Sequence, residues 1–240
     1  MENYNWNWGV LLKDPYISWI ISGFYYTIII SVAAWLIAFT LGSVIGILRT
    51  VDNKIIRTAA TVYVEAFRNI PLLVQMFLWY YVFPELLPAS AGNWLKRDMP
   101  QPQLFTAILA LGLYTASRVA EQVRSGLESI PRGQRNAGLA MGLTVSQVYC
   151  YVLIPVSYRS IIPSLTSDFL GVFKNSSIAL TIGVLELTAQ VRQIEEYTFA
   201  SFEAFIAATA LYCLVTVLVI AAMHIIEART RVSGAIINLG

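Results

Sequence analysis

Charged and polar residues are rare in this sequence, and one group of them lies inside an apolar stretch where it could do chemistry. The group consists of Asp168, Lys174, Asn175, Ser176 and Ser177. A cation, an amide and two hydroxyls can hold a carboxylate or line a hydrated path, and ionisable groups inside a membrane are costly and usually functional. The structural alternative is that Lys174 extends to the membrane surface or pairs with Asp168, while the polar run joins helices. The two charges lie six residues apart, about 9 Å along a helix, so a direct pair needs a break such as Gly171.

Other reactive residue types are too few for a catalytic centre or a metal site. The sequence holds one histidine, His224, and two cysteines, Cys150 and Cys213, which excludes a disulfide framework and a Cys-rich or multi-histidine metal site. We interpret His224 as a packing or interfacial residue, Cys150 as a reduced cytoplasmic thiol and Cys213 as buried in the last helix. The scattered carboxylates disfavour an intramembrane enzyme, and the phosphate loop G-x-x-x-x-G-K-[ST] of an ATPase is missing.

The composition indicates that membrane helices position these residues. Of the 240 residues, 57% are hydrophobic and 12% charged, and the mean hydropathy is +0.64, whereas soluble domains have about 25% charged residues. A soluble globule, a disordered chain and a fibre are therefore excluded. A helical crossing needs roughly 20 residues, and the apolar runs predict an all-α integral membrane protein of one domain, residues 1–240. The five predicted transmembrane helices cover residues 24–48, 58–83, 99–117, 160–185 and 204–226, with residues 16–23 as an interfacial lead-in to the first.

The distribution of lysine and arginine predicts the orientation in the membrane. Connections on one side carry eleven basic residues, among them Arg231 near the end of the chain, and connections on the other side carry four. This asymmetry places the N-terminus outside and the C-terminus in the cytoplasm, which agrees with an odd number of spans. Five of the six tryptophans fall near the outer side, and indole rings prefer the membrane interface.

Two kinds of spacing predict contacts of helices. Gly42 and Gly46 form a GxxxG pair on the first helix, which favours close helix packing, with a subunit interface as the alternative. Two charged pairs have the three-residue spacing of one helix face: Glu65–Arg68 and Glu121–Arg124. We interpret both as ion pairs that neutralise charge, with a gate or a subunit contact as the alternative.

The longest cytoplasmic segment, residues 118–159, is too long for a simple turn, and long loops are usually functional. Pro131 predicts the start of a helix over residues 132–141, which Gly142 ends. Thr144 and Gln147 form a capping box that opens a second short helix, and this helix must stop or kink before Pro155. Segment 129–155 is thus predicted to form two short helices rich in small residues. It is either an amphipathic surface elbow or a docking element for a cytoplasmic partner.

Segment 129–155 also resembles the EAA loop of ABC-importer permeases, whose pattern is EAA-x3-G-x9-I-x-LP. The residues at the corresponding positions are Asn136, Ala137, Gly138, Gly142, Val152, Ile154 and Pro155. Asn136 stands where the family has Glu, and Gly138 stands where it has the second Ala. Residues 65–75, 120–124 with 129–134, and 174–183 resemble polar amino acid permeases, so that the resemblance covers nearly the whole chain. Residues 6–9 and 84–88 are most similar to the larger permease subunit of glutamate/aspartate importers.

The resemblance implies a multi-pass permease subunit of a bacterial inner membrane importer that forms the translocation path. Segment 129–155 would be the coupling loop that contacts a cytoplasmic ABC ATPase dimer, and that dimer would bind ATP and Mg, leaving this chain without a cofactor. The other implied partners are a second permease subunit in a heterodimer, an extracytoplasmic amino acid-binding protein and the amino acid itself, glutamate or aspartate. Membrane lipid surrounds such a chain, and no nucleic acid is expected.

The residues alone leave one further function open. A secondary amino acid transporter driven by an ion gradient would explain Asp168 and Lys174, but it gives segment 129–155 no role. A structural membrane anchor would leave the intramembrane charges without an explanation.

Overall fold

The structure is a computed structural model that describes residues 4–230, all of whose regular elements are helices. The α-helices are α1 (Tyr16–Leu48), α2 (Lys54–Asn69), α3 (Leu72–Phe77), α4 (Phe83–Leu86), α5 (Ala89–Asn93), α6 (Pro102–Glu128), α7 (Arg132–Ala140), α8 (Val145–Val148), α9 (Ile154–Asn175), α10 (Leu187–Thr198) and α11 (Ser201–Thr230). Short 3-10 or π segments accompany them: η1 (Trp8–Leu12), η2 (Leu78–Val82), η3 (Trp94–Asp98), η4 (Tyr149–Leu153) and η5 (Ser176–Ile182). Arg231, which contributes to the predicted orientation, lies outside the described residues.

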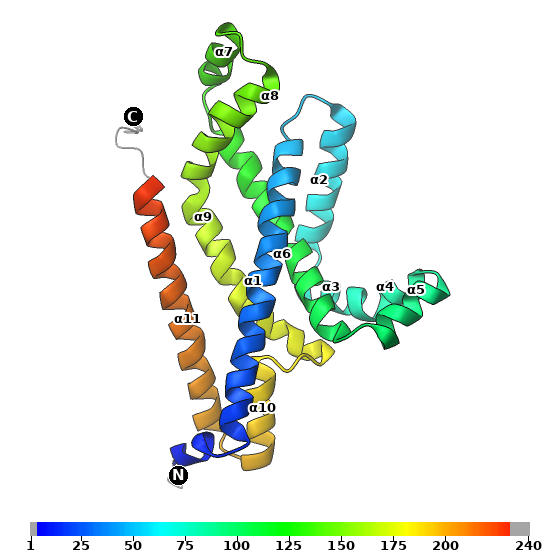
Figure 1. The fold of residues 1–240 in the computed structure, drawn as a ribbon, viewed down its shortest axis with the longest axis vertical. Coiled ribbons are helices and arrows are strands. Elements are labelled where there is room, and N and C mark those ends of the chain that lie inside the picture. Colours follow the sequence, from blue (N-terminus) through cyan, green and yellow to red (C-terminus); the bar gives the residue numbers. More distant parts are fainter. Residues whose placement is uncertain (1–3, 231–240) are drawn as a thin grey trace.

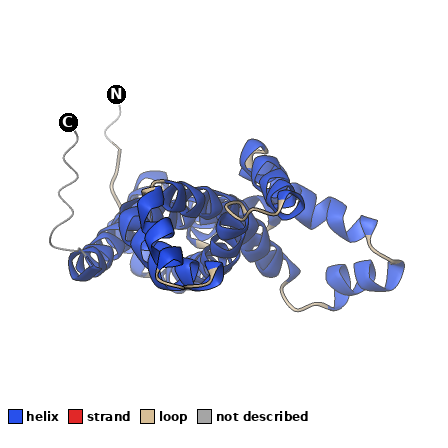
Figure 2. Ribbon diagram, turned by 90° about the horizontal axis from the view of Figure 1, so that it is seen from above, coloured by secondary structure: helices blue, strands red, loops and turns tan. Residues whose placement is uncertain are grey.

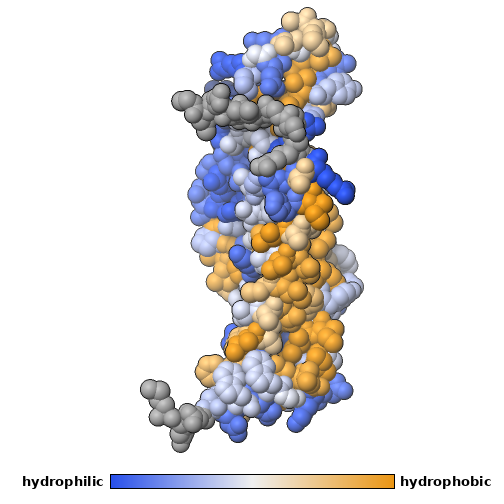
Figure 3. Space-filling view, turned by 90° about the vertical axis from the view of Figure 1, so that its left-hand side faces the viewer, coloured by the Kyte–Doolittle hydropathy of each residue, from blue (hydrophilic) through white to orange (hydrophobic). Residues whose placement is uncertain are grey.

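Four continuous helical stretches are long and apolar enough to cross a membrane: Tyr16–Leu48, Pro102–Glu128, Val145–Ile182 and Ser201–Arg229. They run along the long axis of the molecule, with α7 and α8 at one end and α10 at the other (Figure 1). Seen from above, the long helices form a bundle from which an arm of helices extends to one side (Figure 2). On the face shown, apolar side chains gather in a band over the middle and lower part, whereas the upper end is a mixture of apolar and polar side chains (Figure 3). A surface of this kind suits lipid, where only internally hydrogen-bonded helices can cross.

The predicted second span is not one continuous helix. α2 ends at Asn69, and Ile70 is extended (φ −94°, ψ 128°) because the following Pro71 disfavours the helical conformation in the residue before it. The side-chain amide of Gln75 donates to the carbonyls of Phe67 at 2.7 Å and of Ile70 at 2.8 Å, and so it bridges the interruption. α3 then leads into the side arm with α4 and α5 (Figure 1).

The other predicted spans have the right places but different bounds. The first span and its lead-in form one helix, α1, and the fifth lies within α11. The third begins after Gln101 (φ 51°) and continues to Glu128, so the start of the predicted cytoplasmic segment belongs to α6. The fourth continues unbroken past Gly171 to Asn175, is extended by η5 and ends at Gly183 (φ 87°).

The most extensive contact between two of the described helices joins α1 to α6. A Cβ atom on Gly42 would lie 2.6 Å from the carbonyl oxygen of Ala116, and one on Gly46 would lie 2.7 Å from that of Ala120. Both glycines are therefore needed for the two backbones to approach. This confirms helix packing as the role of the GxxxG pair, and the packing is within one chain.

Candidate functional site

Segment 129–155 folds into the predicted pair of short helices at one end of the molecule (Figure 1). α7 follows Pro131 and ends before Gly142, whose φ of 87° suits a residue without a side chain. The amides of Gly142 and Leu143 donate to carbonyls of α7 at 3.0 and 3.2 Å, which satisfies the helix end. The Thr144 hydroxyl accepts from the amide of Gln147, and the Gln147 side chain accepts from the amide of Thr144. The predicted capping box is confirmed.

The second helix of the segment does not stop before Pro155, and the regular winding that was expected to stop or kink there is interrupted by a π segment. α8 passes through the π segment η4 directly into α9, and Pro155 lies in the first turn of α9. Proline removes an amide and collides with the carbonyl four residues earlier in a regular helix, whereas a wider π turn relieves that collision. Segment 129–155 is therefore joined to a membrane helix without a flexible link.

The residues that match the EAA pattern divide into a surface set and an internal set. Asn136, Ala137 and Gly142 are exposed, whereas Gly138 is buried. A Cβ on Gly138 would lie 3.0 Å from Val148 Cγ2, so this glycine allows α7 to pack on α8 rather than on another protein. The structure adds apolar residues that the sequence reasoning missed: Met141 is 78% exposed and Tyr151 is 71% exposed. Exposed apolar side chains at a protein's end favour contact with a partner.

The buried carboxylate of Asp168 pairs with an arginine of another helix, not with Lys174. Arg118 Nε of α6 lies 2.8 Å from Asp168 Oδ1, and the Asp168 side chain is 2% exposed against 51% for Arg118. The sequence places Arg118 at the start of the predicted cytoplasmic segment, whereas it lies within α6. For this reason the ion pair with Asp168 could not be predicted. Asp168 Oδ2 is buried without a hydrogen-bond partner.

The polar run after Asp168 is only partly available for binding. The hydroxyls of Ser176 and Ser177 donate to the carbonyls of Phe173 and Lys174 within their own helix, at 2.7 and 2.8 Å. Lys174 is exposed, and its ammonium makes no ion pair in the described part of the chain. Asn175 is half-buried. Lys174 is thus the member of the run whose charge is free for another molecule.

A second charged cluster joins three helices near the same end as segment 129–155. Glu121 of α6 lies 2.5 Å from Arg49 after α1, 2.5 Å from Arg124 and 3.3 Å from Arg68 of α2. The predicted pair of Glu121 with Arg124 is confirmed. The predicted pair of Glu65 with Arg68 is wrong, because Arg68 turns to Glu121 and Glu65 accepts from Asn69.

A third carboxylate, Glu186, is buried at the opposite end of the bundle. It caps α10 by accepting from the amides of Thr188 and Ala189 at 3.0 and 2.9 Å, and it also accepts from the hydroxyl of Tyr212 at 2.9 Å. Burial raises the pKa of Glu186 above the ordinary value, although these donors oppose the shift. No sequence pattern predicted this role of Glu186, because it depends on the approach of Tyr212 from α11.

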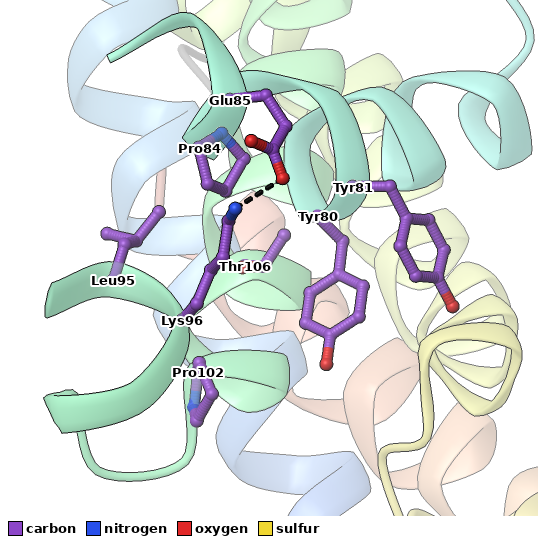
Figure 4. A pocket seen from close by; sticks show the side chains of 8 residues that line it. All are labelled: Tyr80, Tyr81, Pro84, Glu85, Leu95, Lys96, Pro102 and Thr106. Atoms are coloured by element: carbon purple, nitrogen blue, oxygen red, sulfur yellow. Dashed lines mark hydrogen bonds and ion pairs between the residues drawn. The ribbon is translucent and has the colours of Figure 1, made fainter. Parts of the chain in front are cut away.

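The side arm encloses a pocket of about 270 Å³. The pocket is lined by residues of η2 and α4, by residues of η3 and by the start of α6: Tyr80, Tyr81, Pro84, Glu85, Leu95, Lys96, Pro102 and Thr106. The carboxylate of Glu85 forms an ion pair with the ammonium of Lys96 (Figure 4). The rings of Tyr80 and Tyr81 stand on another side of the pocket (Figure 4). This ion pair joins α4 to η3. The other lining residues are Tyr80, Tyr81, Pro84, Leu95, Pro102 and Thr106, most of which are aromatic or apolar.

The remaining candidate residues do not assemble into a reactive centre. His224 and Cys150 are exposed, and Cys213 is exposed on α11 rather than buried, which corrects the prediction. In the described residues, no group of three or more His, Cys, Asp or Glu residues could hold a metal ion.

A bundle of long apolar helices with a two-helix projection at one end is compatible with a transporter subunit, and the comparisons with known proteins identify the family. Residues 38–232 match the sequence profile of the family named binding-protein-dependent transport system inner membrane component, and the chain belongs to this family. It is a permease subunit of an ABC importer in the inner membrane, as the sequence predicted.

Three relatives make the family more specific. The chain is 47% identical to the glutamate/aspartate import permease protein GltJ of Escherichia coli K12, covering 98% of both chains. It is 32% identical to the probable glutamine ABC transporter permease protein GlnM of Bacillus subtilis, covering 88% of this chain and 93% of GlnM. A crystal structure of an amino acid ABC transporter with histidines matches with a TM-score of 0.79 and 28% identity, covering 94% of this chain and all of the other.

Proposed function

We propose that this chain is the permease subunit of an importer for glutamate and aspartate. The observation that carries the proposal is the 47% identity to GltJ over 98% of both chains. A cytoplasmic ATPase dimer binds ATP and Mg and supplies the energy, and an extracytoplasmic binding protein delivers the amino acid. A second, related permease subunit completes the path, since five helices form too small a bundle to surround one.

Segment 129–155 couples this chain to the ATPase in the proposal. The exposed Asn136, Ala137 and Gly142 contact the ATPase together with Met141, while Gly138 holds α7 against α8. Pro155 lies in the turn where the segment continues into α9. A displacement of α7 and α8 is therefore transmitted to α9 as a rigid body.

We further propose five crossings, with the N-terminus outside and the C-terminus in the cytoplasm. α2 and α3 together make the second crossing, although Pro71 divides them. The directions of α1, α2, α6, α9 and α11 alternate along the chain (Figure 1). The excess of basic residues at the end that carries segment 129–155 supports the orientation.

Lys174 is the proposed contact of the path with the amino acid's carboxylate, and Asn175, Ser176 and Ser177 shape the backbone around it. Asp168 contributes by holding α9 against α6 through Arg118. The free charge of Lys174 supports this assignment, because an unpaired ammonium in a membrane helix needs water or an anion.

Reconstitution of the complete importer in liposomes tests the function. We expect the binding protein loaded with glutamate or aspartate to stimulate ATP hydrolysis above the level given by other amino acids, and uptake to require ATP. The ATPase without the permease pair is the control. Stimulation by a different amino acid would contradict the substrate, and uptake driven by an ion gradient without ATP would favour the secondary transporter.

A further inference from the structure

A basic cavity lies between the end of α1, the first turns of α2 and the last turns of α6. It has a volume of about 290 Å³, and its lining includes Arg49, Arg57, Thr58, Val62, Arg124 and Glu128. Arg49 directly follows the apolar helix α1, so the cavity lies where the bundle leaves the membrane. It is separate from segment 129–155 and from Lys174.

Positive charge exceeds negative charge in this cavity. Arg49 is engaged by Glu121, and Arg124 lies 2.5 Å from the only carboxylate in the lining, that of Glu128. The side chain of Arg57 is exposed and makes no ion pair or hydrogen bond within residues 4–230. A guanidinium presents five donors in a plane and binds phosphate with two of them at once. The cavity therefore suits an anionic oxygen group.

The rim of the cavity continues into an exposed apolar face of α2. Val62 lines the cavity and is 62% exposed, and Ile55, two helical turns before it, is 80% exposed. Residues seven apart lie on one face of a helix. A ligand that fits both features has an anionic head and an apolar chain.

We propose that this cavity binds the phosphate of an anionic phospholipid, with Arg57 on the phosphate and an acyl chain along Val62 and Ile55. In the proposed orientation the cavity faces the cytoplasmic leaflet, and basic pockets between membrane helices on that side bind anionic headgroups. A free anion would use the arginines and leave the apolar face uncovered. The site does not depend on which amino acid is transported.

Three substitutions separate this site from general attraction of lipid to a basic surface. Arg57→Gln removes the unpaired cation of the cavity and breaks no contact. Lys54→Gln removes a cation one turn earlier on α2 that is exposed and lies outside the cavity, so it is the matched control. Glu128→Gln removes the only carboxylate of the lining and with it one of the two ion pairs of Arg124, whose other partner is Glu121.

The experiment uses the complete purified importer, stripped of lipid and titrated with phosphatidylglycerol or phosphatidylcholine, with retained lipids counted by native mass spectrometry. We expect retained phosphatidylglycerol to fall about fivefold in Arg57→Gln, because a neutral amide replaces the charge-assisted, bidentate hydrogen bonds of the guanidinium to the phosphate. Lys54→Gln should match the unchanged protein, Glu128→Gln should retain more, and phosphatidylcholine should not be retained. Uptake is measured in parallel, because its loss with normal lipid retention concerns the transport function alone.

Several results would overturn the lipid site. Equal losses in Arg57→Gln and Lys54→Gln would indicate diffuse attraction, and no loss in either would show that the cavity holds no lipid. Retention of inorganic phosphate without phosphatidylglycerol would make the cavity a site for small anions.

Discussion

Truncating Arg118 should destabilise this protein far more than neutralising Asp168, although the two residues form one ion pair. Arg118→Met leaves the Asp168 carboxylate, 2% exposed, without its cation. Removing one partner of a buried pair costs about 3–5 kcal/mol, and the half exposure of Arg118 puts the expected loss near the lower value. Asp168→Asn keeps an oxygen that can accept from Arg118, and that guanidinium can reach solvent. Its expected cost is about 1 kcal/mol, one ordinary hydrogen bond.

The double variant provides the decisive comparison. The double variant, Arg118→Met with Asp168→Asn, lacks both charges. Its free energy of unfolding should be about 2 kcal/mol higher than that of Arg118→Met alone, because a buried amide costs less than a buried charge. The measurement is the free energy of unfolding of the purified chain in mixed micelles, followed by circular dichroism. Equal losses in the two single variants, or a double variant whose loss is the sum of the two within about 0.5 kcal/mol, would show that Asp168 does not depend on Arg118.

Three other predictions concern separate parts of the chain. Lys174→Met should reduce uptake severalfold while the complex assembles with unchanged melting temperature, and normal uptake would refute the pathway role. Gly142→Asp should weaken ATPase binding, measured by co-purification, at a folding cost of about 1–2 kcal/mol from the left-handed backbone. Unchanged binding and uptake would refute the coupling assignment. The raised pKa of Glu186 means that its contribution to stability is lost as pH rises through that pKa. The melting temperature should therefore fall less with rising pH in Glu186→Gln than in the unchanged protein, and parallel curves would contradict this.

Sequence patterns predicted local structure well where one short stretch determines the conformation. The long apolar runs gave the long helices, and Pro131, Gly142 and the Thr144 capping box gave the ends of α7 and α8. The main local error came from a competing local effect, because Pro71 interrupts a run that composition alone makes a single span.

Contacts between distant residues were the part that the sequence could not provide. Three-residue spacing correctly predicted the pair of Glu121 with Arg124. It also predicted a pair of Glu65 with Arg68, but the Arg68 side chain on α2 reaches Glu121 on α6 instead. Sequence spacing identifies which charged side chains can pair on one helix. Which of them pair in the structure depends on how α2 and α6 pack against each other. The role of Glu186 depends in the same way on the approach of α11.

The distribution of these contacts bears on how the proposed coupling would move the bundle. The outer pair of segment 129–155, Arg135 with Asp52 at 3.2 Å, joins exposed groups and contributes about 0–1 kcal/mol. The helical continuation into α9 is therefore the stronger connection. Asp168 then ties α9 to α6 through Arg118. By contrast, α11 is held near its opposite end, where Tyr212 donates to Glu186 and Glu203 accepts from Tyr4 at 2.5 Å. A push on α7 should thus move α9 and α6 together, while α11, which packs on both α9 and α10, is also held at the end where α10 lies.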